Sequence, residues 1–138
     1  MTAPIPVISP PVALPAKQRI RQAFDHAATG YDAAADVQRE MADRLAAYLL
    51  QADVEGEPAA ILDAGCGTGY SAAWLAQRWP RTELVLLDFA PAMLAVARTQ
   101  YPGARMICAD IEALPFGDSG FGGYWSNLTW QWNDPRRC

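Results

Sequence analysis

Few residues in this chain could build a metal centre, a disulfide framework or a membrane anchor. Its 138 residues include three cysteines and one histidine, and because the cysteines are far apart we expect neither structural zinc nor disulfides. No apolar run approaches the roughly 20 residues that cross a bilayer. The net charge of −4 argues against nucleic-acid binding, which usually needs a basic surface. We therefore expect a protein of the reducing cytoplasm with no metal, no nucleic-acid partner and no membrane contact.

The length allows one domain at most, and a hydrophobic content of 51% is enough to form its core. Residues 1–16 are rich in proline and carry no charged side chain. They are predicted to form a disordered leader, since they lack the basic segment that begins a signal peptide.

Two amphipathic helices are predicted next, over residues 17–28 and 33–52. In the first, Ile20, Phe24 and Ala27 recur at helical spacing. In the second, one apolar stripe and an opposite charged face are expected, the charged face being exposed to solvent. The stripe comprises Val37, Met41, Leu45, Tyr48 and Leu49, and the charged face comprises Arg39, Glu40, Asp43 and Arg44.

From residue 57 onward the pattern alternates between strands and helices, which predicts an incomplete, mostly parallel α/β sheet of the Rossmann-like class. Strands are expected at residues 59–63, 83–88, 105–108 and 122–127, with sheet order 3-2-1-4. Helices are expected at residues 70–79 and 91–100. Asn133-Asp134-Pro135 near the end is typical of a helix start. We therefore expect the chain to be the N-terminal half of such a fold, and to be marginally stable and inactive alone.

The most informative stretch is the glycine-rich loop of residues 63–69. A short apolar strand leads to Asp63 and then to three glycines at alternate positions, Gly65, Gly67 and Gly69. Glycines permit a sharp turn and let a ligand approach main-chain N–H groups without meeting a Cβ. The G-x-G-x-G spacing differs from the G-x-G-x-x-G of dinucleotide folds, and no Gly-Lys-Ser/Thr follows as a P-loop requires. This spacing resembles motif I of class I S-adenosylmethionine-dependent methyltransferases.

Two further acids stand where strands are expected to end. Asp88 can accept hydrogen bonds from both hydroxyls of a ribose, and Asp110 can accept one from the adenine amine. Phe89 and Ile111 could enclose the adenine ring. The alternative for each acid is a helix cap or turn, and for Phe89 and Ile111 it is ordinary core packing. Three strand-end acids together favour S-adenosyl-L-methionine as the ligand.

Other positions complete the predicted site. Asp63 is expected to orient the loop and to reach the methionine amino group through water or a backbone contact. Cys66 is expected to be a small filler rather than a nucleophile. After the fourth strand, Trp125, Asn127, Gln131 and Trp132 could form an acceptor pocket with an apolar wall. The alternative is hydrophobic packing of these tryptophans.

The chain resembles the malonyl-acyl-carrier-protein O-methyltransferases of biotin synthesis over nearly everything after the leader. The resemblance rests on Phe24-x-x-Ala27-Ala28-x-x-Tyr31, Gln38, the glycine loop, Asp88, Pro91-x-Met93-Leu94, Asp110-Ile111-Glu112-x-Leu114-Pro115 and Trp125-Ser126-Asn127-Leu128-x-x-Gln131-Trp132. It implies that residues 17–56 form a helical lid, with Tyr31 over the sulfonium end of the cofactor, and adds Met93 and Asn127 to the cofactor contacts. It also implies that the family enzyme extends well past Cys138.

The implied reaction is methylation of the free carboxyl of a malonyl group carried by acyl-carrier protein or coenzyme A. Lys17, Arg19 and Arg21 are candidates for a docking face for the acidic carrier protein. No catalytic side chain is expected, because a carboxylate needs no general base to attack a methyl sulfonium. Two alternatives remain open: methylation of a quinone or another small molecule, and a non-catalytic fragment that binds S-adenosylmethionine.

Overall fold

The four predicted strands form one parallel sheet. A computed structural model describes residues 14–138, so most of the predicted leader lies outside the described residues. The strands are β1 (Ala60–Ala64), β2 (Glu83–Asp88), β3 (Arg105–Cys108) and β4 (Gly123–Trp125). Their order is β3-β2-β1-β4 and every neighbouring pair is parallel, which confirms the predicted topology. β2 and β3 have the predicted bounds, whereas β4 is shorter.

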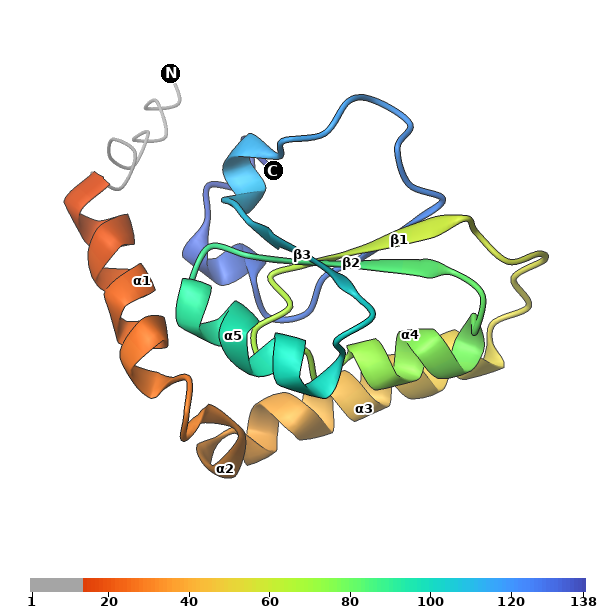
Figure 1. Cartoon of the computed structure of the whole chain (residues 1–138), viewed down its shortest axis with the longest axis horizontal. Helices are drawn as coiled ribbons and strands as arrows, with labels where there is room; N and C mark the ends of the chain where they lie inside the picture. Colours follow the sequence, from red (N-terminus) through yellow and green to blue (C-terminus); the bar gives the residue numbers. More distant parts are fainter. Residues whose placement is uncertain (1–13) are drawn as a thin grey trace, which may run out of the picture.

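Helices follow β1 and β2 as the alternation predicts. α4 (Ala72–Arg78) begins two residues later than expected, and α5 (Pro91–Gln100) has the predicted bounds, with Pro91 at its first position. Proline suits this position because the first helical N–H has no partner within the helix. Figure 1 shows α3 (Asp36–Gln51), α4 and α5 on one side of the sheet.

The opposite face of the sheet is covered by loop residues. Leu62, Val85 and Leu87 of the central strands pack there against Ile111 of the short helix η1 (Ile111–Ala113). Phe116 and Phe121 pack on the same cluster and meet edge to face, with ring centroids 4.9 Å apart. The long connection between β3 and β4 therefore supplies core packing as well as a link (Figure 1).

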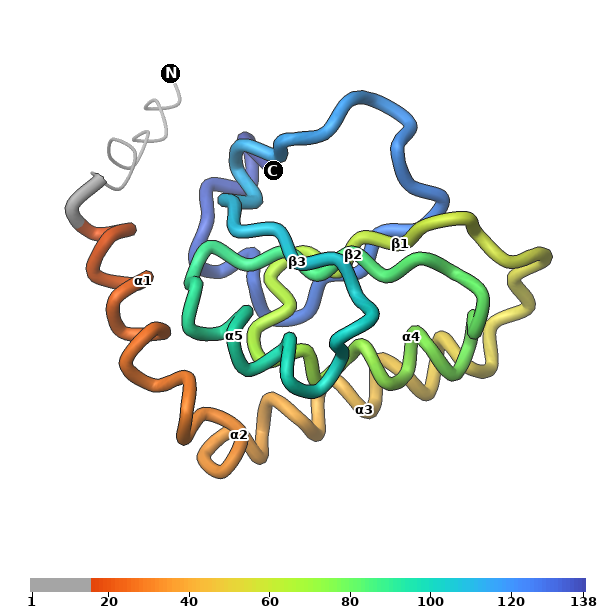
Figure 2. The backbone as a smooth tube through the Cα atoms, in the orientation of Figure 1, coloured from red at the N-terminus to blue at the C-terminus, as the bar shows by residue number. Residues whose placement is uncertain are grey.

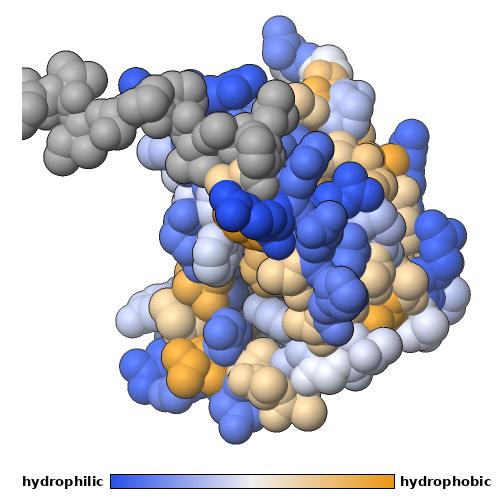
Figure 3. Space-filling model, turned by 90° about the vertical axis from the view of Figure 1, so that its left-hand side faces the viewer, coloured by the Kyte–Doolittle hydropathy of each residue, from blue (hydrophilic) through white to orange (hydrophobic). Residues whose placement is uncertain are grey.

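The N-terminal part forms three helices, not two. α1 (Leu14–Ala27) begins before the predicted position, and the expected helix at residues 33–52 is divided into α2 (Tyr31–Ala34) and α3. The break falls at the buried Ala35, whose φ of −102° and ψ of 34° are not helical. Figure 2 shows α1 beside the carboxyl edge of the sheet and α3 running along α4. Hydrophilic side chains and smaller hydrophobic patches alternate on the face seen from the α1 side (Figure 3).

The predicted inward face of α3 was wrong. Ala42 and Ala46 are buried, and Ala46 packs against Ile61, Leu75 and Trp79. The expected stripe is exposed instead: Val37 by 67%, Met41 by 45%, Leu45 by 39% and Tyr48 by 75%, and only Leu49 of the stripe packs on this cluster. The small side chains form the buried face because they let the helix axis approach the bulky residues of β1 and α4 closely.

This packing predicts opposite responses at two adjacent positions. Ala46→Leu should destabilise the chain by about 1–3 kcal/mol, because the added atoms overpack a filled contact. Leu45→Ala, one residue away, should change the unfolding free energy by less than about 0.5 kcal/mol. Urea denaturation of both variants checks this, and a larger loss for Leu45→Ala would place the stripe in the core after all.

Candidate functional site

The glycine loop has the backbone geometry that its sequence predicts. Gly65, Gly67 and Gly69 have φ values of +77°, +55° and +87°, a region that residues with a Cβ rarely adopt. A Cβ on Gly65 would also collide with the side chain of Thr129. Gly65 therefore permits both the turn and the close approach of the segment after β4.

The N–H groups of the loop are already used within the protein. The Leu87 carbonyl oxygen accepts from the N–H of Gly65 at 2.8 Å and of Cys66 at 2.9 Å. The N–H of Gly67 donates to Asp88 Oδ2 at 2.9 Å, and that of Gly69 to the Cys66 carbonyl at 2.9 Å. These four N–H groups therefore have partners within the chain, unlike the free N–H groups of a P-loop phosphate cradle. The approach of a ligand to the main-chain N–H groups of the loop stays a prediction.

A cavity of about 590 Å³ opens at the carboxyl ends of the strands, where open α/β sheets usually bind their ligands. Its volume lies within the range of small-molecule sites, about 300–1,000 Å³. α1, α2 and α3 line it opposite the strand ends. The predicted site residues that line it are Tyr31, Asp63, Gly65, Cys66, Gly67, Asp88, Phe89, Met93, Asp110, Ile111, Asn127, Gln131 and Trp132.

Two predicted site residues lie elsewhere. Gly69 packs beside Ala97 of α5 and Tyr101, where it shapes the loop. Trp125 lies in the core cluster with Ala46 and Ile61 and is 8% exposed, so its placement in an acceptor pocket was wrong. Successive side chains of β4 point to opposite faces of the sheet, and that of Trp125 lies on the face covered by helices.

Asp63 is a buried carboxyl group with an unused oxygen. It is 2% exposed, it lines the cavity, and its Oδ2 has no hydrogen-bond partner among the described residues. Burial, and secondly the negative charge of Asp88, raise the pKa of Asp63 to about 8. Such a group is suited to a cationic ligand, because a positive charge in the cavity would restore its ionised form.

Asp88 is held by the backbone on both sides. Its Oδ2 accepts from the Gly67 N–H and its Oδ1 from the Ala90 N–H, both at 2.9 Å. The contact with Ala90 is a turn contact, because Ala90 itself, and not Asp88, is the N-cap of α5. A carboxylate has about four acceptor sites, so further sites remain for a diol. Burial raises the pKa of Asp88, against the opposing effect of the backbone hydrogen bonds.

Aromatic and apolar side chains form one wall of the cavity. The Phe24 ring of α1 lies edge-on to Phe89 at 6.1 Å and to Trp132 at 5.7 Å. Met93 is fully buried beside Ala28. Burial raises the pKa of the Cys66 thiol well above its usual range, so Cys66 is a poor nucleophile, in keeping with its predicted role as a filler.

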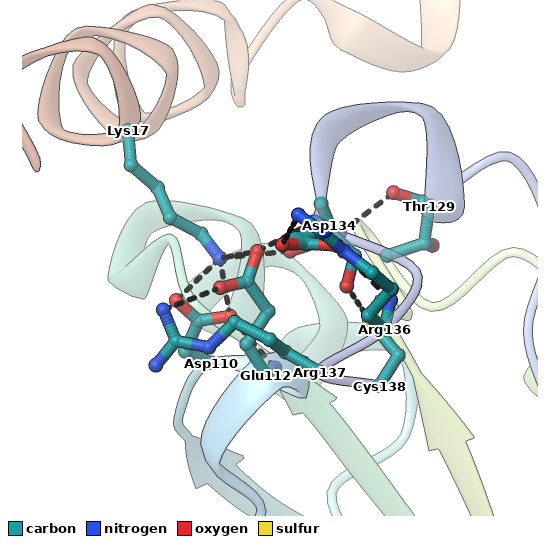
Figure 4. A network of polar contacts seen from close by, with 9 residues as sticks. Lys17, Asp110, Glu112, Thr129, Asp134, Arg136, Arg137 and Cys138 are labelled. Carbon is teal, nitrogen blue, oxygen red and sulfur yellow. Dashed lines mark hydrogen bonds and ion pairs between the residues drawn. The ribbon is translucent and has the colours of Figure 1, made fainter. Parts of the chain in front are cut away.

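A network of ion pairs joins α1 to the end of β3 (Figure 4). Lys17 Nζ lies 2.6 Å from Asp110 Oδ2 and 2.9 Å from Glu112 Oε1, and it donates to Asn133 Oδ1 at 2.9 Å. The hydrogen bond from Lys17 is the main cause that lowers the pKa of Glu112. Asp110 Oδ1 also accepts from the Glu112 N–H, as a cap does. Lys17 is therefore engaged within the chain and is not a free docking residue.

Several polar residues of the cavity were not predicted as site residues. Asp32, Arg39, Thr68 and Tyr70 line it, and Thr68 Oγ1 donates to Asp32 Oδ1 at 2.6 Å. The sequence predicts Arg39 on the solvent face of its helix, whereas the structure places it at the cavity. Sequence spacing shows which residues of a helix share a face, but not which face turns toward the sheet.

Comparison with known proteins agrees with this geometry. A family model described as "Methyltransferase domain" matches residues 61–138, which is more than half of the chain. The chain belongs to the methyltransferase-domain family. It has the Rossmann-like fold of class I methyltransferases, of which the described residues form four strands. A Methanococcus maripaludis protein assigned as an S-adenosylmethionine-dependent methyltransferase shares this fold, with a TM-score of 0.62 at 13% identity, over 93% of this chain and 57% of that one.

Curated relatives carry a more specific name. A protein of Dechloromonas aromatica is 47% identical over 120 residues, and one of Laribacter hongkongensis is 42% identical over 127 residues. Both are named malonyl-[acyl-carrier protein] O-methyltransferase. The alignments cover 87% and 84% of this chain but 43% and 42% of the relatives. The chain thus spans less than half the length of the curated relatives it matches.

Among the described residues no helix is long and apolar enough to cross a membrane.

The raised pKa of Asp63 predicts an unusual pH dependence of stability. Above the unfolded pKa of about 3.9, folding must protonate this group, so its contribution to stability falls as pH rises from about 4 to the folded value of about 8. Asp63→Asn removes the penalty. The ligand-free variant should gain at least about 2 kcal/mol over the parent at pH 8, with little gain near pH 4. Urea melts across this range test it, and parallel pH curves would contradict it.

The Lys17 network predicts that α1 loosens when the cation is removed. Lys17→Met leaves Asp110 and Glu112 without their shared partner, so amide hydrogen exchange in α1 should accelerate by about tenfold or more. Arg19→Met on the exposed side of α1 is the matched control. Because the folded pKa of Glu112 is lowered, the contribution of this group is present above about pH 4.3 and is lost as pH falls through the lowered value. Equal exchange in parent and variant would show that the network does not hold α1.

Proposed function

We propose that this chain is the cofactor-binding part of an S-adenosyl-L-methionine-dependent O-methyltransferase that esterifies the free carboxyl of a malonyl group on acyl-carrier protein. The observation that supports S-adenosylmethionine as the cofactor is the set of acids at the strand ends. The Oδ2 atom of Asp63, which has no hydrogen-bond partner among the described residues, lies in the same cavity. The name shared by the curated relatives supports malonyl carrier protein as the methyl acceptor.

The residues of the cavity fit S-adenosylmethionine better than a phosphate-bearing nucleotide. Asp88 and Asp110 supply acceptors for hydroxyl and amine groups, and Phe89 and Ile111 supply apolar surface for a base. The loop N–H groups that would hold a phosphate are occupied by Leu87, Asp88 and Cys66. S-adenosylmethionine has a ribose, an adenine and an ammonium group but no phosphate, which matches this set.

Little chemistry is required of the protein in such a transfer. Bound S-adenosylmethionine supplies an electrophilic methyl group on a sulfonium. The malonyl carboxylate is already ionised at neutral pH and needs no base. The protein contributes by holding the reacting groups in line and by excluding water. Phe24, Tyr31 and Trp132, which line the cavity, are suited to that purpose.

The segment after β4 supports an acceptor site beside the glycine loop. Ser126 Oγ donates to the Ala64 carbonyl at 2.9 Å, and Thr129 packs on Gly65. These contacts hold Asn127, Gln131 and Trp132 at the cavity. An acidic carrier protein, or coenzyme A, would present the malonyl group there. We also propose a reducing cytoplasmic location, from the wide spacing of the three cysteines in the sequence.

The proposal predicts which acceptor is labelled. The complete gene product that carries this sequence, incubated with methyl-labelled S-adenosylmethionine, should transfer label to malonyl carrier protein in preference to quinone precursors or free small acids. Asp88→Ala should reduce kcat/KM by about tenfold or more, because hydrogen bonds to a diol are lost in a buried site. The 138 residues alone are expected to transfer no methyl group.

Two outcomes would count against this function. Label found only in the quinone would overturn the assignment of the acceptor and leave the assignment of the cofactor unchanged. Undiminished activity of a folded Asp88→Ala variant would remove Asp88 from the site.

A further inference from the structure

Lys17 is the centre of the ion-pair network that joins α1 to two other parts of the chain (Figure 4). Its Nζ lies 2.7 Å and 2.6 Å from the two carboxylate oxygens of Asp110, and 2.9 Å from both Glu112 Oε1 and Asn133 Oδ1. An ammonium group has three N–H donors, and these three side chains take all of them. Lys17 therefore has no donor left for a ligand and acts through the residues that it holds.

Asp110 keeps an acceptor site for a donor in the cavity. A carboxylate has about four acceptor sites. Oδ1 accepts from Lys17 and, at 3.0 Å, from the Glu112 N–H, whereas Lys17 is the partner of Oδ2 among the described residues. The Asp110 side chain lines the cavity and is 32% exposed. The proposed adenine amine is a donor that would fill the remaining site on Oδ2 and cover the ion pair with Lys17.

On its other side, Lys17 holds the end of residues 126–134, which we call the acceptor segment. Asn133 accepts from Lys17 and donates through Nδ2 to a backbone carbonyl of the same segment at 2.8 Å. The N–H of Asp134 donates to Glu112 Oε1, also at 2.8 Å. The start of the segment is held by the end of β1, so its far end depends on α1 and η1.

A second contact of α1 connects the same two places. The Phe24 ring lies edge-on to Phe89, which belongs to the proposed adenine wall, and edge-on to Trp132 of the acceptor segment. Lys17 and Phe24 are about two helical turns apart and therefore lie on one face of α1. This face of α1 contacts the nucleoside end of the proposed site and the acceptor segment together.

Resting on the proposed cofactor, we propose that Lys17 is a positioning residue that links recognition of the adenine amine to the order of the acceptor segment. A base amine that donates to Asp110 covers the ion pair with Lys17, and the pair becomes stronger because water screens it less. Lys17 is then held more firmly, and it holds Asn133 more firmly in turn. Binding is therefore ordered, because malonyl carrier protein meets a formed acceptor segment only after S-adenosylmethionine is in place.

Amide hydrogen exchange over the acceptor segment of the complete gene product measures this link. The two ligands, each at saturation, are S-adenosylhomocysteine and its 6-deamino analogue, in which hydrogen replaces the adenine amine. In the parent, S-adenosylhomocysteine should slow exchange at least about fivefold more than the analogue does. Lys17→Met keeps the aliphatic stem but removes the ammonium. In this variant the effects of the two ligands should agree within about twofold.

Two other variants make the test specific. Arg19→Met is the matched control, since Arg19 is an exposed residue of the same helix, and it should keep the fivefold difference. Asn133→Ala cuts the link beyond Lys17, so the difference should vanish in the acceptor segment and persist in α1. This variant keeps the test decisive if Lys17→Met does not fold.

A purely structural role for Lys17 makes a different prediction. Exchange would then be faster in ligand-free Lys17→Met, but the fivefold difference between the two ligands would remain, and this result would overturn the proposal. Equal protection by both ligands in the parent would also overturn it, while the cofactor assignment would stand. If the parent binds neither ligand, both the cofactor assignment and the role of Lys17 fail.

Discussion

Hydrogen bonds between the glycine loop and the end of β2 hold the whole site together. The Leu87 carbonyl accepts from two successive loop N–H groups, and Asp88 accepts from a third. Each bond contributes about 1 kcal/mol, but their geometric effect is larger, because they fix Asp63 and Asp88 on adjacent strands at one edge. The positive φ of Gly65 makes this possible, and Thr129 then closes over the loop.

The site also keeps buried polar atoms that have no hydrogen-bond partner among the described residues. Asp63 and Arg39 each bury a polar atom with no partner, which lowers the stability of the ligand-free chain. Proteins often accept such costs at functional sites. A ligand that supplies a partner to each atom would remove both costs, so the same groups that weaken the free chain would favour its complex.

The N-terminal helices complete the cavity from opposite ends. Lys17 of α1 ties the end of β3 through Asp110 and Glu112, and Arg39 of α3 lies beside the glycine loop. α3 reaches this position because Ala42 and Ala46 allow close packing on β1 and α4. Most of its larger apolar residues are left exposed, so the most hydrophobic stripe of a helix is not always its buried face.

The sequence alone determined the parallel sheet and its strand order, the bounds of β2, β3 and α5, and the acids at the strand ends. These features follow from local periodicity and from glycine conformations that other residues rarely adopt. Only the tertiary structure decided the rotation of α3, the burial of Trp125, the engagement of Lys17 and the position of Arg39. Each depends on which surfaces of distant segments fit together, and local spacing carries no information on that fit.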